Sequence, residues 1–67
     1  MARAYVITVD QASTLERLYH NGAMSAADFD RRVLESLVER GLAIKHQNGH
    51  AVTFSISGQG RAIYKSL

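Results

Sequence analysis

The chain has 67 residues, of which 46% are hydrophobic and none is cysteine, and its formal net charge is +2. These values exclude a disordered tail, a disulfide framework and a cysteine-based zinc site, and they predict one domain, residues 1–67. No apolar run approaches the ~20 residues of a membrane span, so we expect a cytoplasmic protein without membrane contact, whose weak positive charge permits nucleic-acid binding without requiring it.

The first predicted element is a helix from Val9 to His20. Thr8 and Gln11 have the spacing of a capping box, in which a hydroxyl and an amide side chain bond the first free backbone N–H groups. The apolar residues behind this cap recur at helical spacing: Ala12, Leu15, Leu18 and Tyr19. Asn21-Gly22 is expected to end the helix, because both residues tolerate the left-handed conformation.

A short β-favouring run, Tyr5-Val6-Ile7, precedes this helix. It predicts either an extended arm over the core or a short N-terminal strand. Exchange of this arm between two subunits would produce a homodimer, which the marginal stability of so small a domain also favours.

Residues 25–40 allow two interpretations. One is a continuous helix from Ser25 to Arg40, and the other is a one-turn helix followed by a separate helix from about Arg31. Asp30 favours the break, because in a continuous helix its carboxylate would lie within the apolar stripe. As the N-cap of a separate helix, the same side chain is favourable.

Arg40-Gly41-Leu42 is the strongest helix stop in the chain, and a β-hairpin is expected after it. A two-residue turn at Asn48-Gly49 would place the apolar residues of the two strands on opposite faces. A three-residue loop, Gln47-Asn48-Gly49, places them all on one face. We therefore predict the pairs His46 with His50, Ile44 with Val52, and Leu42 with Phe54. Ser57 then caps a last helix over residues 58–67.

Two of these segments, taken in order, resemble the end of the winged helix-turn-helix domain of MarR-type regulators. Val38-Glu39-Arg40-Gly41-Leu42-Ala43 is similar to their recognition-helix ending, and Ile56-Ser57-Gly58-Gln59-Gly60-Arg61 to the start of the helix after their wing. The resemblance implies an α+β fold, a small winged-helix domain with the order helix, short helix, helix, β-hairpin and helix. Only residues 21–30 are available for the helix that precedes the recognition helix in that family, so this helix should be shortened or missing.

In a winged helix the recognition helix enters the major groove and the wing touches the DNA backbone. The resemblance therefore implies a small DNA-binding transcription regulator that uses helix 31–40 and the wing hairpin 42–56, with double-stranded DNA as its partner. The candidate DNA-binding residues are Arg31, Arg32, Ser36 and Arg40 on the helix, and Lys45, His46, Gln47, Asn48 and His50 on the wing.

The charges on the helix also support an alternative. The wing carries no carboxylate, whereas the helix face opposite the core carries Asp28, Glu35 and Glu39 beside Arg32. Asp28–Arg32 and Arg31–Glu35 have the spacing of i,i+4 surface pairs. The second hypothesis is accordingly a protein-binding winged helix, an adapter or inhibitor that does not bind DNA. Such short winged helices also resemble regulators from phages and mobile elements.

No pattern in the chain indicates catalysis. There is no nucleophile motif, and Gly58-Gln59-Gly60 is too short for a dinucleotide fingerprint. His46 and His50 would be neighbours across the hairpin, but a zinc site needs at least a third protein ligand. We expect a protein that is not an enzyme and that has no metal and no cofactor.

Overall fold

The computed structural model describes residues 6–25 and 31–67. Over these residues the chain forms helices and an antiparallel sheet, which confirms the predicted α+β winged-helix fold. The elements are α1 (Val9–Asn21), β1 (Met24–Ser25), α2 (Arg31–Glu39), β2 (Ala43–Asn48), β3 (Ala51–Ile56) and α3 (Gly58–Ser66). The strand order is β1-β3-β2, so β3 is central.

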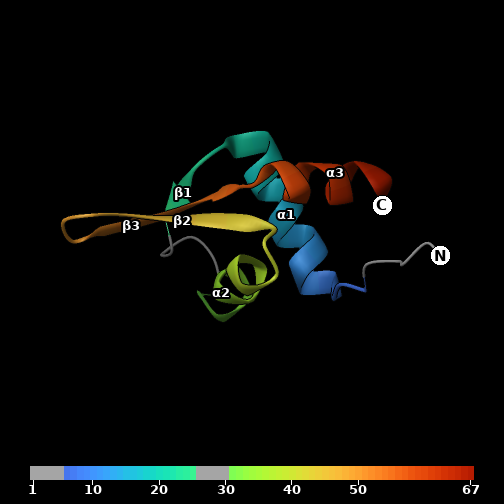
Figure 1. Cartoon of the computed structure of the whole chain (residues 1–67), viewed down its shortest axis with the longest axis horizontal. Helices are drawn as coiled ribbons and strands as arrows, with labels where there is room; N and C mark the ends of the chain where they lie inside the picture. The colour runs from blue at the N-terminus through green and yellow to red at the C-terminus, as the bar shows by residue number, and fades with distance from the viewer. Residues whose placement is uncertain (1–5, 26–30) are drawn as a thin grey trace.

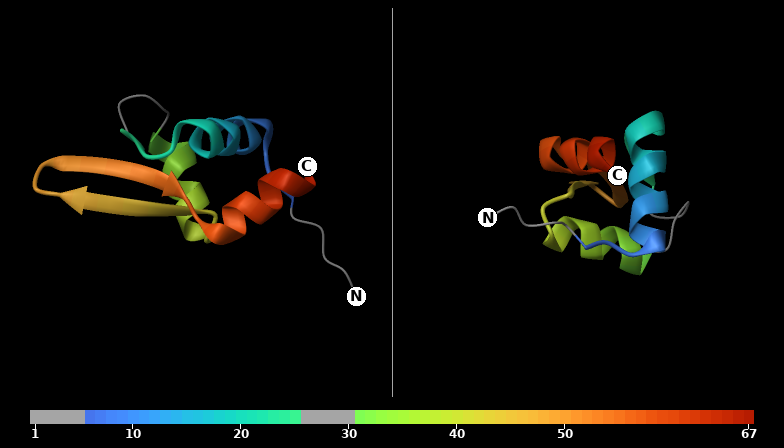
Figure 2. Two further views of the ribbon diagram at one scale, coloured as in Figure 1. Left: turned by 90° about the horizontal axis from the view of Figure 1, so that it is seen from above. Right: turned by 90° about the vertical axis from the view of Figure 1, so that its right-hand side faces the viewer.

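The hairpin β2–β3 projects from one end of the helices (Figure 1). Viewed along the hairpin, α2 and α3 lie on opposite sides of its base and α1 lies beside both (Figure 2). The fully buried side chains come from α1, α2, the turn after α2, and β3: Leu15, Leu18, Leu34, Leu37, Leu42 and Phe54. Ile63 of α3 and Met24 of β1 pack against this core from outside.

The start and end of α1 follow the predicted pattern. The Gln11 backbone N–H donates to Thr8 Oγ1 at 3.1 Å, and the Thr8 N–H donates back to Gln11 Oε1 at 3.0 Å, so the capping box is confirmed. Gly22 follows the last helical residue with a φ of 78°, and its N–H donates to the Leu18 carbonyl oxygen.

The described part of α2 begins at Arg31, directly after residues 26–30. Ser25 belongs to β1, so the predicted alternative of a helix that starts at Ser25 is wrong. The proposed one-turn helix at 26–30 and the cap at Asp30 lie outside the described residues.

The end of α2 is a Schellman motif. The Gly41 N–H donates to the Val38 carbonyl oxygen at 3.0 Å, and the Leu42 N–H donates to the Leu37 carbonyl oxygen at 2.9 Å. Gly41 has the positive φ, 76°, that this ending requires. Leu42 is fully buried as part of the helix cap and does not belong to the strand that follows.

The predicted hairpin register is wrong, because it counted Leu42 as a strand residue. The strand begins at Ala43, which takes the inward row opposite Ile56, and so the next residue, Ile44, points outward and is 46% exposed. The loop has two residues, Gly49 and His50, and not the predicted three. Gly49 has a φ of 63° at the first loop position, where type II′ turns need glycine.

The corrected register also separates the two wing histidines. His46 pairs with Thr53, and His50 lies in the loop, so the predicted His46–His50 pair does not form. Likewise Ile44 pairs with Ser55, and Lys45 takes the place opposite Phe54.

The third strand is not at the N-terminal run where the sequence suggested one. Met24 and Ser25 pair with Phe54 and Thr53 of β3. Val6 is 78% exposed, and Ile7 packs against the core without joining a strand. Tyr5 lies outside the described residues.

A direct contact between α3 and the turn after α2 closes the base of the hairpin. The Ser57 N–H donates to the Leu42 carbonyl oxygen at 3.1 Å, and Ser57 Oγ donates to the Gly41 carbonyl oxygen at 2.7 Å. The same hydroxyl accepts from the Gly60 N–H at 2.9 Å, so Ser57 caps α3 as predicted. Gly60 is buried against Leu42.

Replacing Gly60 with alanine is expected to destabilise the fold. A Cβ at this position would overlap the Leu42 carbonyl oxygen and lie 2.8 Å from Ile56 Cγ1, so the backbone must move. We expect Gly60→Ala to lower the free energy of unfolding by about 2 kcal/mol or more. Gly58→Ala is the matched control in the same turn, where a Cβ meets nothing within 4 Å. Urea unfolding followed by circular dichroism measures both; equal stability of the two variants would contradict this packing.

Candidate nucleic-acid interface

The first turn of α2 presents two arginines. Leu34 and Leu37 are fully buried and fix one face of the helix against the core. Arg31 and Arg32 are both exposed at the beginning of the helix. The helix thus exposes positive charge at the end where recognition helices place their base-contacting side chains.

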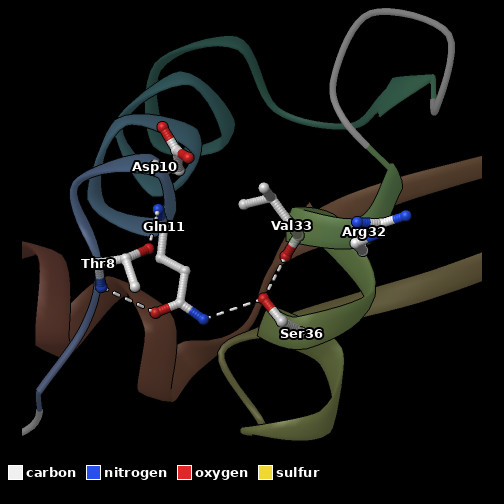
Figure 3. A pocket seen from close by; sticks show the side chains of 6 residues that line it. All are labelled: Thr8, Asp10, Gln11, Arg32, Val33 and Ser36. Atoms are coloured by element: carbon white, nitrogen blue, oxygen red, sulfur yellow. Dashed lines mark hydrogen bonds between the residues drawn. The ribbon is translucent and has the colours of Figure 1, made fainter.

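The side chain of Gln11 joins the start of α1 to α2. Gln11 is only 7% exposed. Its Nε2 donates to Ser36 Oγ at 2.9 Å, and Ser36 Oγ donates in turn to the Val33 carbonyl oxygen at 2.7 Å (Figure 3). Gln11 Oε1 also accepts from Arg40 Nη1 at 3.3 Å. One amide therefore completes the α1 cap and bonds both Ser36 in α2 and Arg40 directly after it.

A shallow groove of about 380 Å³ lies where these helices meet (Figure 3). Its lining residues are Thr8, Asp10, Gln11, Arg32, Val33 and Ser36. The Ser36 hydroxyl and the Gln11 amide in this lining are already bonded to each other. Ser36 and Arg40, which the sequence placed at the DNA groove, thus make contacts within the fold that orient α2.

Glu35 links α2 to the wing. Its Oε2 accepts from Lys45 Nζ of β2 at 2.9 Å and from Arg31 Nε at 3.4 Å. The second contact confirms the predicted Arg31–Glu35 pair, while Asp28 lies outside the described residues. The hydrogen bond from Lys45 lowers the pKa of Glu35 below its ordinary value of 4.5, and the Arg31 contact acts in the same direction. The Lys45 contact was not expected, because it depends on the true hairpin register.

The remaining wing candidates lie along the projecting hairpin. Gln47, Asn48 and His50 are exposed. His46 is exposed too, and its Nε2 lies 2.9 Å from Ser55 Oγ on the neighbouring strand. Alternation along β2 puts Lys45 and Gln47 on one face of the hairpin and His46 and Asn48 on the other. No single surface therefore contains every wing residue that the sequence proposed.

Aromatic side chains of α1 and α3 form a cluster that was not predicted from the sequence. The Tyr19 and Tyr64 rings have centroids 4.7 Å apart, and His20 Nε2 lies 3.3 Å from the Tyr64 hydroxyl oxygen. Arg61 lies over the Tyr19 ring at 5.8 Å. These contacts hold α3 to the end of α1, on the far side of the hairpin base from α2 (Figure 2).

Two negative observations apply to residues 6–25 and 31–67. No group of three potential ligands among His, Asp and Glu comes together there in a way that could hold a metal ion. No helix in this part of the chain is long and apolar enough to cross a bilayer.

The structure is similar to solved structures of transcriptional regulators. One is BpsR from Bordetella bronchiseptica, whose DNA binding is regulated by 6-hydroxynicotinic acid. It matches with a TM-score of 0.82 and 26% sequence identity. Another is a probable transcriptional regulator from Pseudomonas aeruginosa, with a TM-score of 0.78 and 26% identity. Each match covers 90% of this chain and 55% of the other, so this chain spans about half the length of these regulators. No family model matches the sequence, and no curated protein does.

The Glu35 contacts predict how its pKa responds to Lys45→Ala. Because the folded pKa is lowered, the ion pair stabilises the fold above pH 4.5, and this contribution disappears as the pH falls through the folded pKa. Removal of Lys45 should move the Glu35 titration midpoint upward, toward 4.5. Side-chain carboxyl NMR at a series of pH values measures this midpoint. An unchanged midpoint would show that Lys45 does not hold the carboxylate in solution.

Proposed function

We propose that this protein binds duplex DNA as a small transcription regulator, with α2 in the major groove and the hairpin β2–β3 on the DNA backbone. The observation that carries the proposal is the arrangement of α2 and the projecting hairpin, a fold shared at TM-scores of 0.82 and 0.78 with transcriptional regulators. Both neighbours are regulators and not enzymes, which supports a regulatory role over a catalytic one.

On the helix, Arg31 and Arg32 are the residues proposed to meet the DNA first. Both are exposed on the first turn of α2, and arginine can make the bidentate contact to guanine that is the commonest specific contact. Ser36 and Arg40 serve mainly to hold α2 on α1 through Gln11. They would therefore affect DNA binding indirectly, by fixing the angle of α2 relative to α1.

On the wing, the electrostatics favour a polyanion. The hairpin and its flanks, residues 42–56, contain no Asp or Glu. Lys45 lies beside α2, where it would reach a phosphate next to the groove that α2 occupies. Further along the hairpin, Gln47 and His50 would donate hydrogen bonds to the DNA backbone. Since His46 and Asn48 point to the other face, we expect a smaller contribution from them.

Regulators of this kind bind symmetric sites as dimers, with one recognition helix for each half-site. We propose that this chain dimerises in the same way. The proposed contact is the apolar surface at the start of α1, where Val6 before the helix is 78% exposed and Val9, its first residue, is 84% exposed.

If α2 binds DNA, Arg32→Ala should lower the affinity for DNA more than removal of a positive charge elsewhere on the protein. The wild type should bind a labelled random-sequence duplex in fluorescence anisotropy, with an affinity that falls steeply as salt rises. Arg32→Ala should weaken binding about fivefold or more, as expected from the loss of one contact worth about 1 kcal/mol. Lys65→Ala removes the same charge from the exposed end of α3 and should leave the affinity nearly unchanged.

Absence of duplex binding by the wild type at low salt would overturn the proposal. A protein partner for the same face would then become the leading hypothesis. Equal losses in Arg32→Ala and Lys65→Ala would instead show that α2 does not have the proposed role.

A further inference from the structure

One carboxylate oxygen holds two of the proposed DNA-binding cations. Glu35 Oε2 lies 2.9 Å from Lys45 Nζ and 3.4 Å from Arg31 Nε. These cations come from different elements, Lys45 from β2 and Arg31 from α2, and both belong to the proposed interface. Glu35 itself is partly exposed, with 37% of its side chain accessible, so a ligand on this surface would meet it.

A phosphate oxygen and a carboxylate oxygen make the same kind of charge-assisted hydrogen bond to such cations. Arg31 and Lys45 therefore cannot bind a DNA phosphate through the same donors while they hold Glu35. A glutamate is charged at neutral pH, and the contact from Lys45 lowers the pKa of Glu35 further below its ordinary value. DNA must then either displace this carboxylate, leaving it unpaired near the phosphates, or bind without these donors of Arg31 and Lys45.

We propose that Glu35 is an internal counter-ion that competes with DNA phosphate for Arg31 and Lys45 and so limits the affinity of this surface for duplexes of any sequence. The inference rests on the proposed DNA-binding function.

The opposite effect would follow if Glu35 mainly positioned the wing. The carboxylate connects α2 to β2, and its loss could let the hairpin change its angle to the helix. In that case neutralising Glu35 would weaken DNA binding. The sign of the change therefore separates competition from positioning.

Glu35→Gln and Glu39→Gln form the matched pair for this test. Each removes one negative charge from α2 and keeps the shape of the side chain, but only Glu35 contacts both cations, whereas Glu39 is exposed at the end of the helix. We expect Glu35→Gln to bind a random-sequence duplex about five- to tenfold more tightly than the wild type, because two surface ion pairs of modest strength are removed. Its dependence on salt should become steeper by about one released ion. Glu39→Gln should gain about twofold at most from the general change in charge.

Adding Lys45→Ala to Glu35→Gln should remove most of the gain, because the released lysine is then absent. Circular dichroism melting of each variant confirms that the fold is intact. Equal affinities of Glu35→Gln and Glu39→Gln, or weaker binding by Glu35→Gln, would overturn the inference while leaving DNA binding by the wild type in place. If neither the wild type nor Glu35→Gln binds the duplex at low salt, the proposed function itself fails and the inference fails with it.

Discussion

The contact between the turn after α2 and the first turn of α3 is the constraint on which the rest of the structure depends. The Leu42 carbonyl oxygen accepts from the Ser57 N–H and lies against Gly60, where no side chain would fit. Ser57 Oγ bonds the neighbouring Gly41 carbonyl. The two ends of the hairpin are thereby fixed to each other and to both flanking helices. The wing projects from this closed base in a direction that α2 and α3 determine together.

A second set of contacts fixes α2 itself, and through it the charges of the proposed interface. The Gln11 amide connects the capped start of α1 to Ser36 and Arg40, so the helix cannot rotate without breaking these bonds. With α2 and the hairpin both fixed, Glu35 meets Lys45 across the two elements. The proposed interface therefore contains a carboxylate among its cations and is not simply basic.

The features that could be predicted from sequence are those that short-range hydrogen bonds determine. The Thr8–Gln11 capping box, the Gly41 helix end and the Ser57 cap each depend on residues within a few positions of one another, and each formed as predicted. The hairpin register was mispredicted because Leu42 was assigned to the strand, whereas it completes the helix cap and shifts the alternation. The pairing of Met24 in β1 and the hydrogen bond of Gln11 to α2 join residues that are far apart in the sequence. No local pattern predicts such contacts.

The central claim is that α2 and the wing form one DNA-binding surface, and amide chemical-shift mapping tests it most directly. Titration of ¹⁵N-labelled protein with a short duplex at low salt should shift the amides of Arg31, Arg32, Lys45 and the Gly49-His50 loop most strongly. The amides of α3 on the far side, such as those of Lys65 and Ser66, should stay in place. Shifts centred on α3, or no shifts at all, would contradict the account.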